Sequence, residues 1–501
     1  LISAMQSLLS RMSRSRNSSC SAIISLWLLC LCFVCDDTVA LENDNYKEMK
    51  HWYTRYASYP PYCSTPDEMA SRTVPPMTTD VPTKLLHVTT IIRHGARTPY
   101  RVVDCWDGFW KDGSDTAKWD CELKTMMSPP APPEITSAEN NNNNAKKEDP
   151  ELAGEGSMFL FEKRYDGLTK PLKNIMNGTC QMGQLLLRGY VQELENGRIL
   201  NSAYLKSTSN SKYAHDERLT LFDVTTATDD EKRLFYQEPN FYYRADDDQR
   251  TLMSGQVLLR GLFRPITQTL TPIYDDSHNI IQEDPVVVLH TADKSRDILS
   301  PNHKVCPRLT ELSEDCFKSE EFQTFNSSNS AKQTRQLMEQ NLGKNFEYDG
   351  LDCLMTTICT DRKLPDILND YNDTTIHDQK PVSHVFKRVA DLSAKSFLFP
   401  MIYNDGAYAK LAMAPLWFYI MKNILPFSSE SSSNDGPKLA LFSGHDTTIM
   451  PILASLGKKL WNGIDLIPYA SMLMIEIHEI LDDDNNGSDA SLVLFPTKRA
   501  F

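Results

Sequence analysis

Residues 85–92 form a run rich in apolar and β-branched side chains, and the loop sequence R-H-G-A-R-T-P at 93–99 follows it directly. A run of this kind is typical of a buried strand in a parallel sheet, and Gly95 and Pro99 favour a loop at its carboxyl end. Ligands of open α/β sheets bind at that edge. The sequence therefore predicts an α/β fold in which residues 93–99 lie at a binding site.

The residue types of this loop suit a phosphoryl group. Arg93 and Arg97 carry rigid forked donors that keep their charge at any working pH, so they match phosphate oxygens better than lysines would. Their charges should also lower the pKa of His94 and keep its imidazole neutral, as a nitrogen nucleophile requires. The alternative is a histidine satisfied in a turn beside solvated arginines, but the agreement of motif and strand favours a phosphate site.

A second strand-and-loop pattern occurs far downstream. Residues 439–444 form a short apolar strand, His445 and Asp446 follow it, and an apolar helical segment comes next. Taken alone, Asp446 fits a helix N-cap, with Pro451 in the first turn. Its combination with the loop at 93–99 favours a functional role for Asp446 over that of a cap.

The two motifs together resemble those of the histidine acid phosphatases, the branch of the histidine phosphatase superfamily that includes lysosomal and prostatic acid phosphatases and phytases. Further segments carry the same resemblance, namely 244–254, 289–307 and 468–476. The resemblance covers most of residues 84–480 in separated blocks and weakens over 101–175 and 310–400.

The resemblance implies a set of site residues and a mechanism. Its members are the nucleophile His94, the acid Asp446, and the phosphate-binding residues Arg93, Arg97, Arg250 and His445. His94 would attack phosphorus, Asp446 would protonate the leaving alcohol, and water would hydrolyse the phosphohistidine. Because Asp446 must start protonated, we expect acidic conditions, or a pKa raised by burial and by the incoming phosphate, to favour turnover.

This chemistry needs no metal or cofactor. The sequence holds no Cys-x-x-Cys, no His-Glu-x-x-His and no Gly-x-x-x-x-Gly-Lys motif, and the acidic run at 482–484 is typical of a solvated hairpin turn. Fifty-two basic and 66 acidic residues give a net charge of −14, which excludes nucleic acid and anionic membrane surfaces as general partners. The expected partner is a small-molecule or glycan phosphomonoester.

The amino-terminal residues predict entry into the secretory pathway. Basic residues precede an apolar run at 23–34, and small residues at 38–40 offer a cleavage site, as in a signal peptide; an uncleaved anchor would be the one membrane attachment. Eight cysteines outside this segment, an even number, fit disulfides, and sequons suit glycosylation. We expect a secreted, lysosomal or vacuolar, or Golgi-lumenal protein.

Alternating strand-like and helical segments predict a mixed, mainly parallel sheet layered by helices, with an inserted, mainly helical cap implied by the resemblance. The apolar segment 411–425 contains Pro415 and Lys422, so we expect a buried helix there. The expected organisation is a signal peptide or anchor at 1–40, an N-terminal segment at 41–83, the first part of the catalytic domain at 84–300 with a variable insertion at 101–175, the cap at 301–400, and the second part of the catalytic domain at 401–501.

The substrate stays open at this level. Residues 180–184 and 195–197, with the His445–Asp446 block, resemble the 2-phosphoxylose phosphatases, whereas phytases share both main motifs. A secreted phosphate-binding protein without turnover could keep the arginines but would have little need for His94 and Asp446. A phosphoglycerate-mutase-like transferase would also use a phosphohistidine, but the signal segment and the cysteines argue against it.

Overall fold

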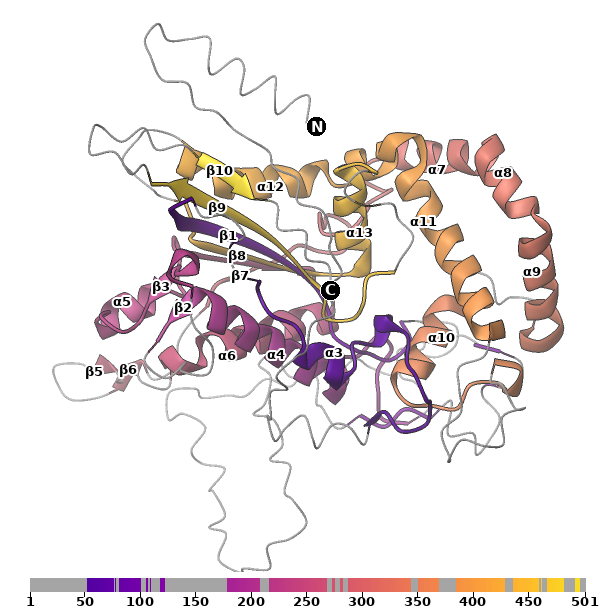
Figure 1. Cartoon of the computed structure of the whole chain (residues 1–501), viewed down its shortest axis with the longest axis horizontal. Coiled ribbons are helices and arrows are strands. Elements are labelled where there is room, and N and C mark those ends of the chain that lie inside the picture. Colours follow the sequence, from indigo (N-terminus) through magenta and orange to yellow (C-terminus); the bar gives the residue numbers. More distant parts are fainter. Residues whose placement is uncertain are drawn as a thin grey trace, which may run out of the picture.

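The computed structural model is shown in Figure 1. It describes residues 52–75, 77, 81–100, 105–106, 109, 118–121, 178–207, 216–267, 273–274, 280–282, 287–343, 350–368, 384–428, 436–458, 461, 466–481 and 492–495. The predicted targeting segment at 1–40, nearly all of the insertion at 101–175 beyond a few residues near its start, and the acidic turn at 482–484 lie outside these residues.

A six-stranded mixed sheet forms the centre of the molecule, in the order β10-β9-β1-β8-β4-β7. Strands β1, β8, β4 and β7 are parallel neighbours, whereas β9 runs antiparallel to both β1 and β10. The predicted mixed, mainly parallel sheet is therefore confirmed. The strand bounds are Thr83–Arg93 for β1, Phe241–Ala245 for β4, Leu289–His290 for β7, Leu439–Gly444 for β8, Met472–Ile480 for β9 and Leu492–Phe495 for β10.

Helices cover both faces of this sheet, which explains why β8 is buried along its whole length and β1 along most of its length. On one face, α4 (Leu187–Tyr204) and α6 (Gln249–Thr267) pack against side chains such as Leu439 and Leu441. The other face, with Ala440 and Phe442, packs against α11 (His384–Ala412), α12 (Ala414–Ile424) and α13 (Asp446–Ser455). Alternate side chains of one strand thus enter two separate cores.

Further helices form an arc beside the sheet, in the range for which a cap is expected (Figure 1). They are α7 (Arg308–Lys318), α8 (Glu320–Ser327), α9 (Asn329–Leu342) and α10 (Gly350–Cys359). Ser319 and Ser328 cap α8 and α9 by accepting a backbone N–H. Helix α11 links this arc to the sheet and is interrupted at residues 403–406, where Gly406 has φ +70° and a Cβ would lie 2.7 Å from the Ala454 carbonyl oxygen.

Six of the eight cysteines expected to form disulfides do so, in the pairs Cys63–Cys359, Cys105–Cys353 and Cys121–Cys180. Cys306 and Cys316 are free thiols. The even count in the sequence therefore overstated the pairing. Two of the three bridges end on α10, which fastens this short helix to one segment that precedes β1 and one that follows it.

The remaining elements are short. They are η2 (Pro61–Cys63), α3 (Pro66–Ala70), β2 (Leu205–Lys206), η4 (Glu217–Leu219), β3 (Phe222–Asp223), α5 (Asp229–Leu234), β5 (Ile273–Tyr274), β6 (Ile280–Gln282), η5 (Asp366–Leu368) and η6 (Leu425–Ser428). The apolar segment 411–425 is divided between α11, α12 and η6. Within the described ranges, no helix combines the length and apolarity needed to cross a membrane.

Candidate active site

The two sequence motifs meet because β1 and β8 are parallel neighbours that end together. Arg93 pairs with Gly444 in the sheet register, and the His94 N–H donates to the Gly444 carbonyl oxygen over 3.0 Å. Strand β4 ends at the same edge, since its last residue, Ala245, pairs with Ser443 of β8. The loops after these three strands therefore supply His94, His445 and the segment that leads to Arg250, as expected for a ligand site at the carboxyl ends of parallel strands.

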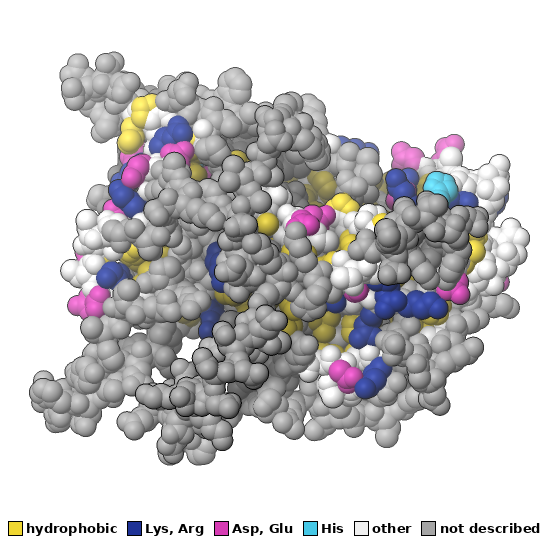
Figure 2. Space-filling model, turned by 60° about the horizontal axis from the view of Figure 1, so that its bottom comes forward, with side chains coloured by type: hydrophobic (Ala, Val, Ile, Leu, Met, Phe, Trp, Pro, Cys, Tyr) yellow, Lys and Arg dark blue, Asp and Glu magenta, His cyan; other side chains and the backbone are white. Residues whose placement is uncertain are grey.

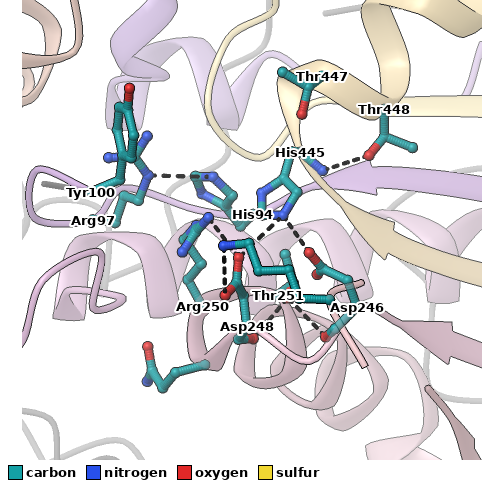
Figure 3. A network of polar contacts seen from close by, with 12 residues as sticks. His94, Arg97, Tyr100, Asp246, Asp248, Arg250, Thr251, His445, Thr447 and Thr448 are labelled. Atoms are coloured by element: carbon teal, nitrogen blue, oxygen red, sulfur yellow. Dashed lines mark hydrogen bonds and ion pairs between the residues drawn. The ribbon is translucent and has the colours of Figure 1, made fainter. Parts of the chain in front are cut away.

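His94 is buried, with 1% of its surface exposed. Its Nδ1–H donates to the Gly95 carbonyl oxygen over 2.8 Å, which leaves the lone pair on Nε2, and Arg97 Nε points at that nitrogen from 3.4 Å (Figure 3). Burial, and then the charges of Arg97, Arg250 and Arg93, hold the pKa of His94 well below its usual value. The expected direction is right, but burial is a larger cause than the arginines.

Gly95 is required by packing. A Cβ at this position would lie 2.4 Å from the Gly189 carbonyl oxygen in α4, and a Cβ at Gly189 would lie 2.3 Å from the Ala96 carbonyl oxygen. The two glycines let the loop lie directly against the helix backbone. Gln192 of α4 then accepts the Ala96 N–H over 2.9 Å, which fixes the loop that carries His94.

Arg93 is completely buried and lies against two aromatic rings that also contact each other. Its guanidinium carbon lies 4.4 Å from the centre of the Tyr62 ring and 4.3 Å from that of Tyr469, and it donates to the Tyr62 hydroxyl and the Ile467 carbonyl oxygen. Its Nη2 also lies 3.0 Å from Asp446 Oδ2. Sequence reasoning missed Tyr62, which belongs to no motif; Tyr469 lies in a segment that resembles the family but had no assigned role.

Arg97 is held by an acidic residue of α10. Its Nη1 lies 2.9 Å from Asp352 Oδ1 of α10 and donates to the Thr98 carbonyl oxygen over 2.9 Å. Asp352 was also missed, because it lies between two cysteines in a stretch where the family resemblance is weak. A single acidic residue in a largely apolar helix carries no recognisable signal.

Arg250 and His445 face the same space from the ends of β4 and β8 (Figure 3). Arg250 Nη2 lies 2.9 Å from Asp248 Oδ2, and His445 Nε2 lies 2.5 Å from Asp246 Oδ2 and 3.6 Å from Asp248 Oδ2. The rings of His94 and His445 are 5.3 Å apart, edge to face. The structure thus brings all six predicted site residues to one edge of the sheet, with three acidic partners that were not predicted.

Asp446 is the first residue of α13, and His445 occupies the N-cap position, so the N-cap alternative for Asp446 is wrong. Burial raises the pKa of Asp446, but the charges of Arg93, Arg97 and His445 outweigh it, and the net shift is downward. This corrects the expectation of a pKa raised by burial. Without a ligand, Asp446 is a carboxylate paired with Arg93.

A cation is one conceivable ligand of the acidic cluster. Asp246, Asp248 and His445 offer ligand atoms within 4.8 Å of one another. The ion pair from Arg250 to Asp248 and the hydrogen bond between His445 and Asp246 already engage this set. These contacts use one oxygen of each carboxylate, and the buried Asp246 Oδ1 has no hydrogen-bond partner among the described residues.

The site brings three arginines together in a chain with a net charge of −14. Figure 2 shows basic and acidic side chains on the face turned forward, whereas Arg93 and Arg97 of the site are buried. Each of the four basic residues of the site lies beside a carboxylate: Arg93 with Asp446, Arg97 with Asp352, Arg250 with Asp248 and His445 with Asp246. An incoming anion therefore meets basic groups that are already paired with carboxylates.

Comparison with known proteins identifies similar sequences over most of the chain. The model of the histidine phosphatase superfamily, branch 2, matches residues 84–493. Counting factor 60 of Dictyostelium discoideum is 26% identical over 83% of this chain and 80% of its own length. Human lysosomal acid phosphatase is 27% identical, and the match spans 61% of each chain. The 2-phosphoxylose phosphatase 1 of Xenopus tropicalis is 25% identical over 79% of this chain and 65% of its own.

Solved structures with a similar course of the chain include the multiple inositol polyphosphate phosphatase of Bifidobacterium longum, in complex with inositol hexasulfate. It has a TM-score of 0.42 at 11% identity and covers 89% of this chain and 90% of that chain. A phytase of Klebsiella has a TM-score of 0.40 at 14% identity, with 82% of each chain covered.

Proposed function

The chain belongs to branch 2 of the histidine phosphatase superfamily, and from this we propose that it hydrolyses phosphomonoesters through a phosphohistidine on His94. One observation carries the proposal. His94 is buried and neutral, its Nδ1–H donates to the Gly95 carbonyl oxygen, and its Nε2 lone pair accepts a hydrogen bond from Arg97 Nε over 3.4 Å. A neutral nitrogen nucleophile surrounded by guanidinium groups fits attack on a phosphoryl group.

In the first step, the phosphoryl group of the substrate lies between Arg97, Arg250 and His445. His94 Nε2 attacks phosphorus in line, a nitrogen–phosphorus bond forms, and the bond from phosphorus to the ester oxygen breaks. Protonated Asp446 gives its proton to the leaving oxygen. The guanidinium groups stabilise the charge on the equatorial oxygens without forming any bond.

In the second step, water attacks the phosphohistidine. Asp446, now a carboxylate, accepts a proton from the water, the nitrogen–phosphorus bond breaks, and inorganic phosphate leaves with His94 neutral again. Arg93 keeps Asp446 in place through the 3.0 Å ion pair, and Tyr62 and Tyr469 keep Arg93 in place in turn. The residues of the site need no added cofactor for either step.

The pH dependence follows from Asp446. Its pKa is lowered in the free protein, so its proton is available for the leaving group at acidic pH or after the phosphate dianion offsets the charges of Arg93 and Arg97. We therefore propose activity that rises as the pH falls from neutral.

The test is release of inorganic phosphate from an aryl phosphate between pH 3 and pH 8 in the presence of chelator. We expect acid-favoured activity in the wild type, none in His94→Ala, and loss of rate with a flattened pH profile in Asp446→Asn. Labelled phosphate trapped by acid quenching should be bound to His94. Undiminished labelling or turnover in folded His94→Ala would sink the assignment.

Three disulfides and the lysosomal and 2-phosphoxylose phosphatase relatives support a place in the secretory pathway. We propose a lumenal or secreted, acidic compartment. For the substrate, the candidates are a simple phosphomonoester, a phosphorylated sugar of a glycan, and phytate. Comparing kcat/KM for an aryl phosphate, a pentose 2-phosphate and phytate under one set of conditions ranks them directly.

A further inference from the structure

We propose that Asp352 of α10 is a positioning residue that orients Arg97 toward His94, and that two disulfides fasten α10 for this purpose. The inference rests on the proposed function, since it names the residue that directs one of the phosphate-binding arginines. Asp352 itself touches no reacting atom. It acts through Arg97.

The contacts of Asp352 fix the arginine in one orientation. Oδ1 lies 2.9 Å from Arg97 Nη1, and Oδ2 accepts the Tyr100 N–H over 3.0 Å, so both carboxylate oxygens are bound to the loop that carries the arginine. The Thr98 carbonyl oxygen accepts from the same Nη1. With Nη1 held on this side, Arg97 Nε faces His94 Nε2 at 3.4 Å (Figure 3).

The flexible side chain of arginine could otherwise take many orientations. Arg97 and Asp352 are both buried, with 7% and 12% of their side chains exposed, so solvent competes little for this ion pair. A carboxylate is the required group because it accepts at both oxygens. An amide offers one acceptor and one donor, and its donor would face either the guanidinium or the Tyr100 N–H.

The two disulfides connect α10 to the chain just after the Arg97 loop and to the segment of Tyr62, which contacts Arg93. Cys353 follows Asp352 directly and is bonded to Cys105, five residues beyond Tyr100. Cys359, the last residue of α10, is bonded to Cys63, and Tyr62 beside it lies over Arg93. Each bridge is therefore one residue away from a side chain that holds a phosphate-binding arginine.

All four of these cysteines are buried, with at most 2% of their surface exposed. Arg188 of α4 also donates to the Cys359 carbonyl oxygen over 3.1 Å, which fixes the carboxyl end of α10 to the helix that packs against the His94 loop. A helix held at both ends can keep one carboxylate in place for Arg97.

The test is a double-mutant cycle between Asp352→Asn and Arg97→Gln. Because a displaced arginine costs transition-state stabilisation, we expect Asp352→Asn to lower kcat/KM on the order of 10- to 100-fold. If Asp352 acts through Arg97, the same change in the Arg97→Gln background should lower it by less than about 2-fold. Effects that multiply in the double variant would overturn the proposal.

Two further variants separate positioning from general damage. Asp352→Glu keeps both acceptor oxygens and should recover part of the kcat/KM lost in Asp352→Asn, which a purely steric fault would not allow. Asp366→Asn removes an exposed carboxylate of η5 that pairs with Lys363. This variant should leave kcat/KM unchanged. Thermal unfolding and a thiol count establish that each variant is folded with its disulfides formed.

A binding measurement separates this proposal from the proposed function. Calorimetry with inorganic phosphate needs no turnover, and we expect Asp352→Asn to weaken binding by about 5- to 50-fold. A wild type that binds phosphate without hydrolysing any phosphomonoester would contradict the proposed function. The phosphate affinities of Asp352→Asn and the wild type would still decide the role of Asp352. Equal phosphate affinity in folded Asp352→Asn and wild type would overturn the positioning role.

Discussion

Asp248 contacts Arg250 and His445, two of the basic residues that would bind a phosphate group. Its Oδ2 is 2.9 Å from Arg250 Nη2 and 3.6 Å from His445 Nε2. A carboxylate that contacts two basic side chains resembles two oxygens of a phosphate group in charge and geometry. The free site is therefore already neutralised, and the affinity for phosphate reflects the difference between two sets of ion pairs.

Removing this charge should make phosphate bind more tightly. For Asp248→Asn we expect the Kd of inorganic phosphate, measured by calorimetry at pH 6, to fall by about 3- to 10-fold, because a carboxylate and a phosphate a few ångströms apart repel each other. The neighbouring, exposed Asp247→Asn is the matched control and should change the Kd less. Weaker binding in Asp248→Asn would mean that Asp248 positions Arg250 instead of competing for it.

Single residues differ in how far their sequence reveals them. His94 and Asp446 stand in motifs whose chemistry can be argued from the side chains, and the lowered pKa of His94 follows from its neighbours and its burial. The direction of the Asp446 shift does not, because it depends on a 3.0 Å ion pair to Arg93 that only the folded chain creates. Asp352 and Tyr62 reach the site from distant segments, with no local pattern to mark them.

At the level of elements, the approach of α4 to α6 sets the position of both the His94 loop and Arg250. A Cβ on Gly197 would lie 2.1 Å from the Leu258 carbonyl oxygen, so the helix backbones are in direct contact. Gly197→Ala must push the helices apart. We expect it to lower the free energy of unfolding by about 1–3 kcal/mol in urea titrations, even though alanine favours a helix more than glycine does.

Ser202→Ala on the exposed side of α4 is the control for this change. It should alter the free energy of unfolding by less than about 0.5 kcal/mol. A Gly197→Ala variant as stable as the wild type would show that the two helices can separate at no cost, contrary to their packing here.

The bridges to α10 give a second prediction at this level. Replacing Cys105 and Cys353 together by serine should lower the free energy of unfolding by about 2–4 kcal/mol, as for other native disulfides. It should also raise the KM for an aryl phosphate several-fold, because α10 then holds Asp352 less firmly against Arg97.

The bridge between Cys121 and Cys180 provides the comparison, since it does not end on α10. Its double serine variant should lose stability with a smaller change of KM, measured by steady-state kinetics at 25 °C. Equal effects of the two variants on KM would show that α10 has no special connection with the site.

The arrangement of the whole molecule was predictable where the sequence carries periodic or motif signals. The mostly apolar run at 85–92 predicted a buried parallel strand, and the two motifs together predicted one site; the structure shows that β1 and β8 are neighbours. The supports of the site were not predictable, because residues 52–75 and α10 join it through disulfides and aromatic contacts over separations of up to 296 residues. Sequence patterns report local structure, whereas such contacts depend on the complete fold.

The stability of the whole molecule should depend on pH through Glu193, which lies completely buried in α4. Burial raises the pKa of this carboxyl to about 8, although a hydrogen bond from Asn196 and the charge of Arg72 oppose the shift. A carboxyl that titrates near 4.5 when unfolded and near 8 when folded stabilises the fold fully below pH 4.5. That contribution is lost as the pH rises toward 8.

The free energy of unfolding of the wild type should therefore carry a term that falls by about 3 kcal/mol between pH 5 and pH 8, at about 1.4 kcal/mol per unit of pKa difference. Glu193→Gln removes the ionisation and should be the more stable protein at pH 8 by about that amount. Glu314→Gln, an exposed change on α7, should follow the wild type at both pH values. If the free energies of unfolding of Glu193→Gln and the wild type, from urea titrations, change with pH in parallel, this prediction is wrong. If they converge toward pH 5, the fold itself, as well as Asp446, is suited to an acidic compartment.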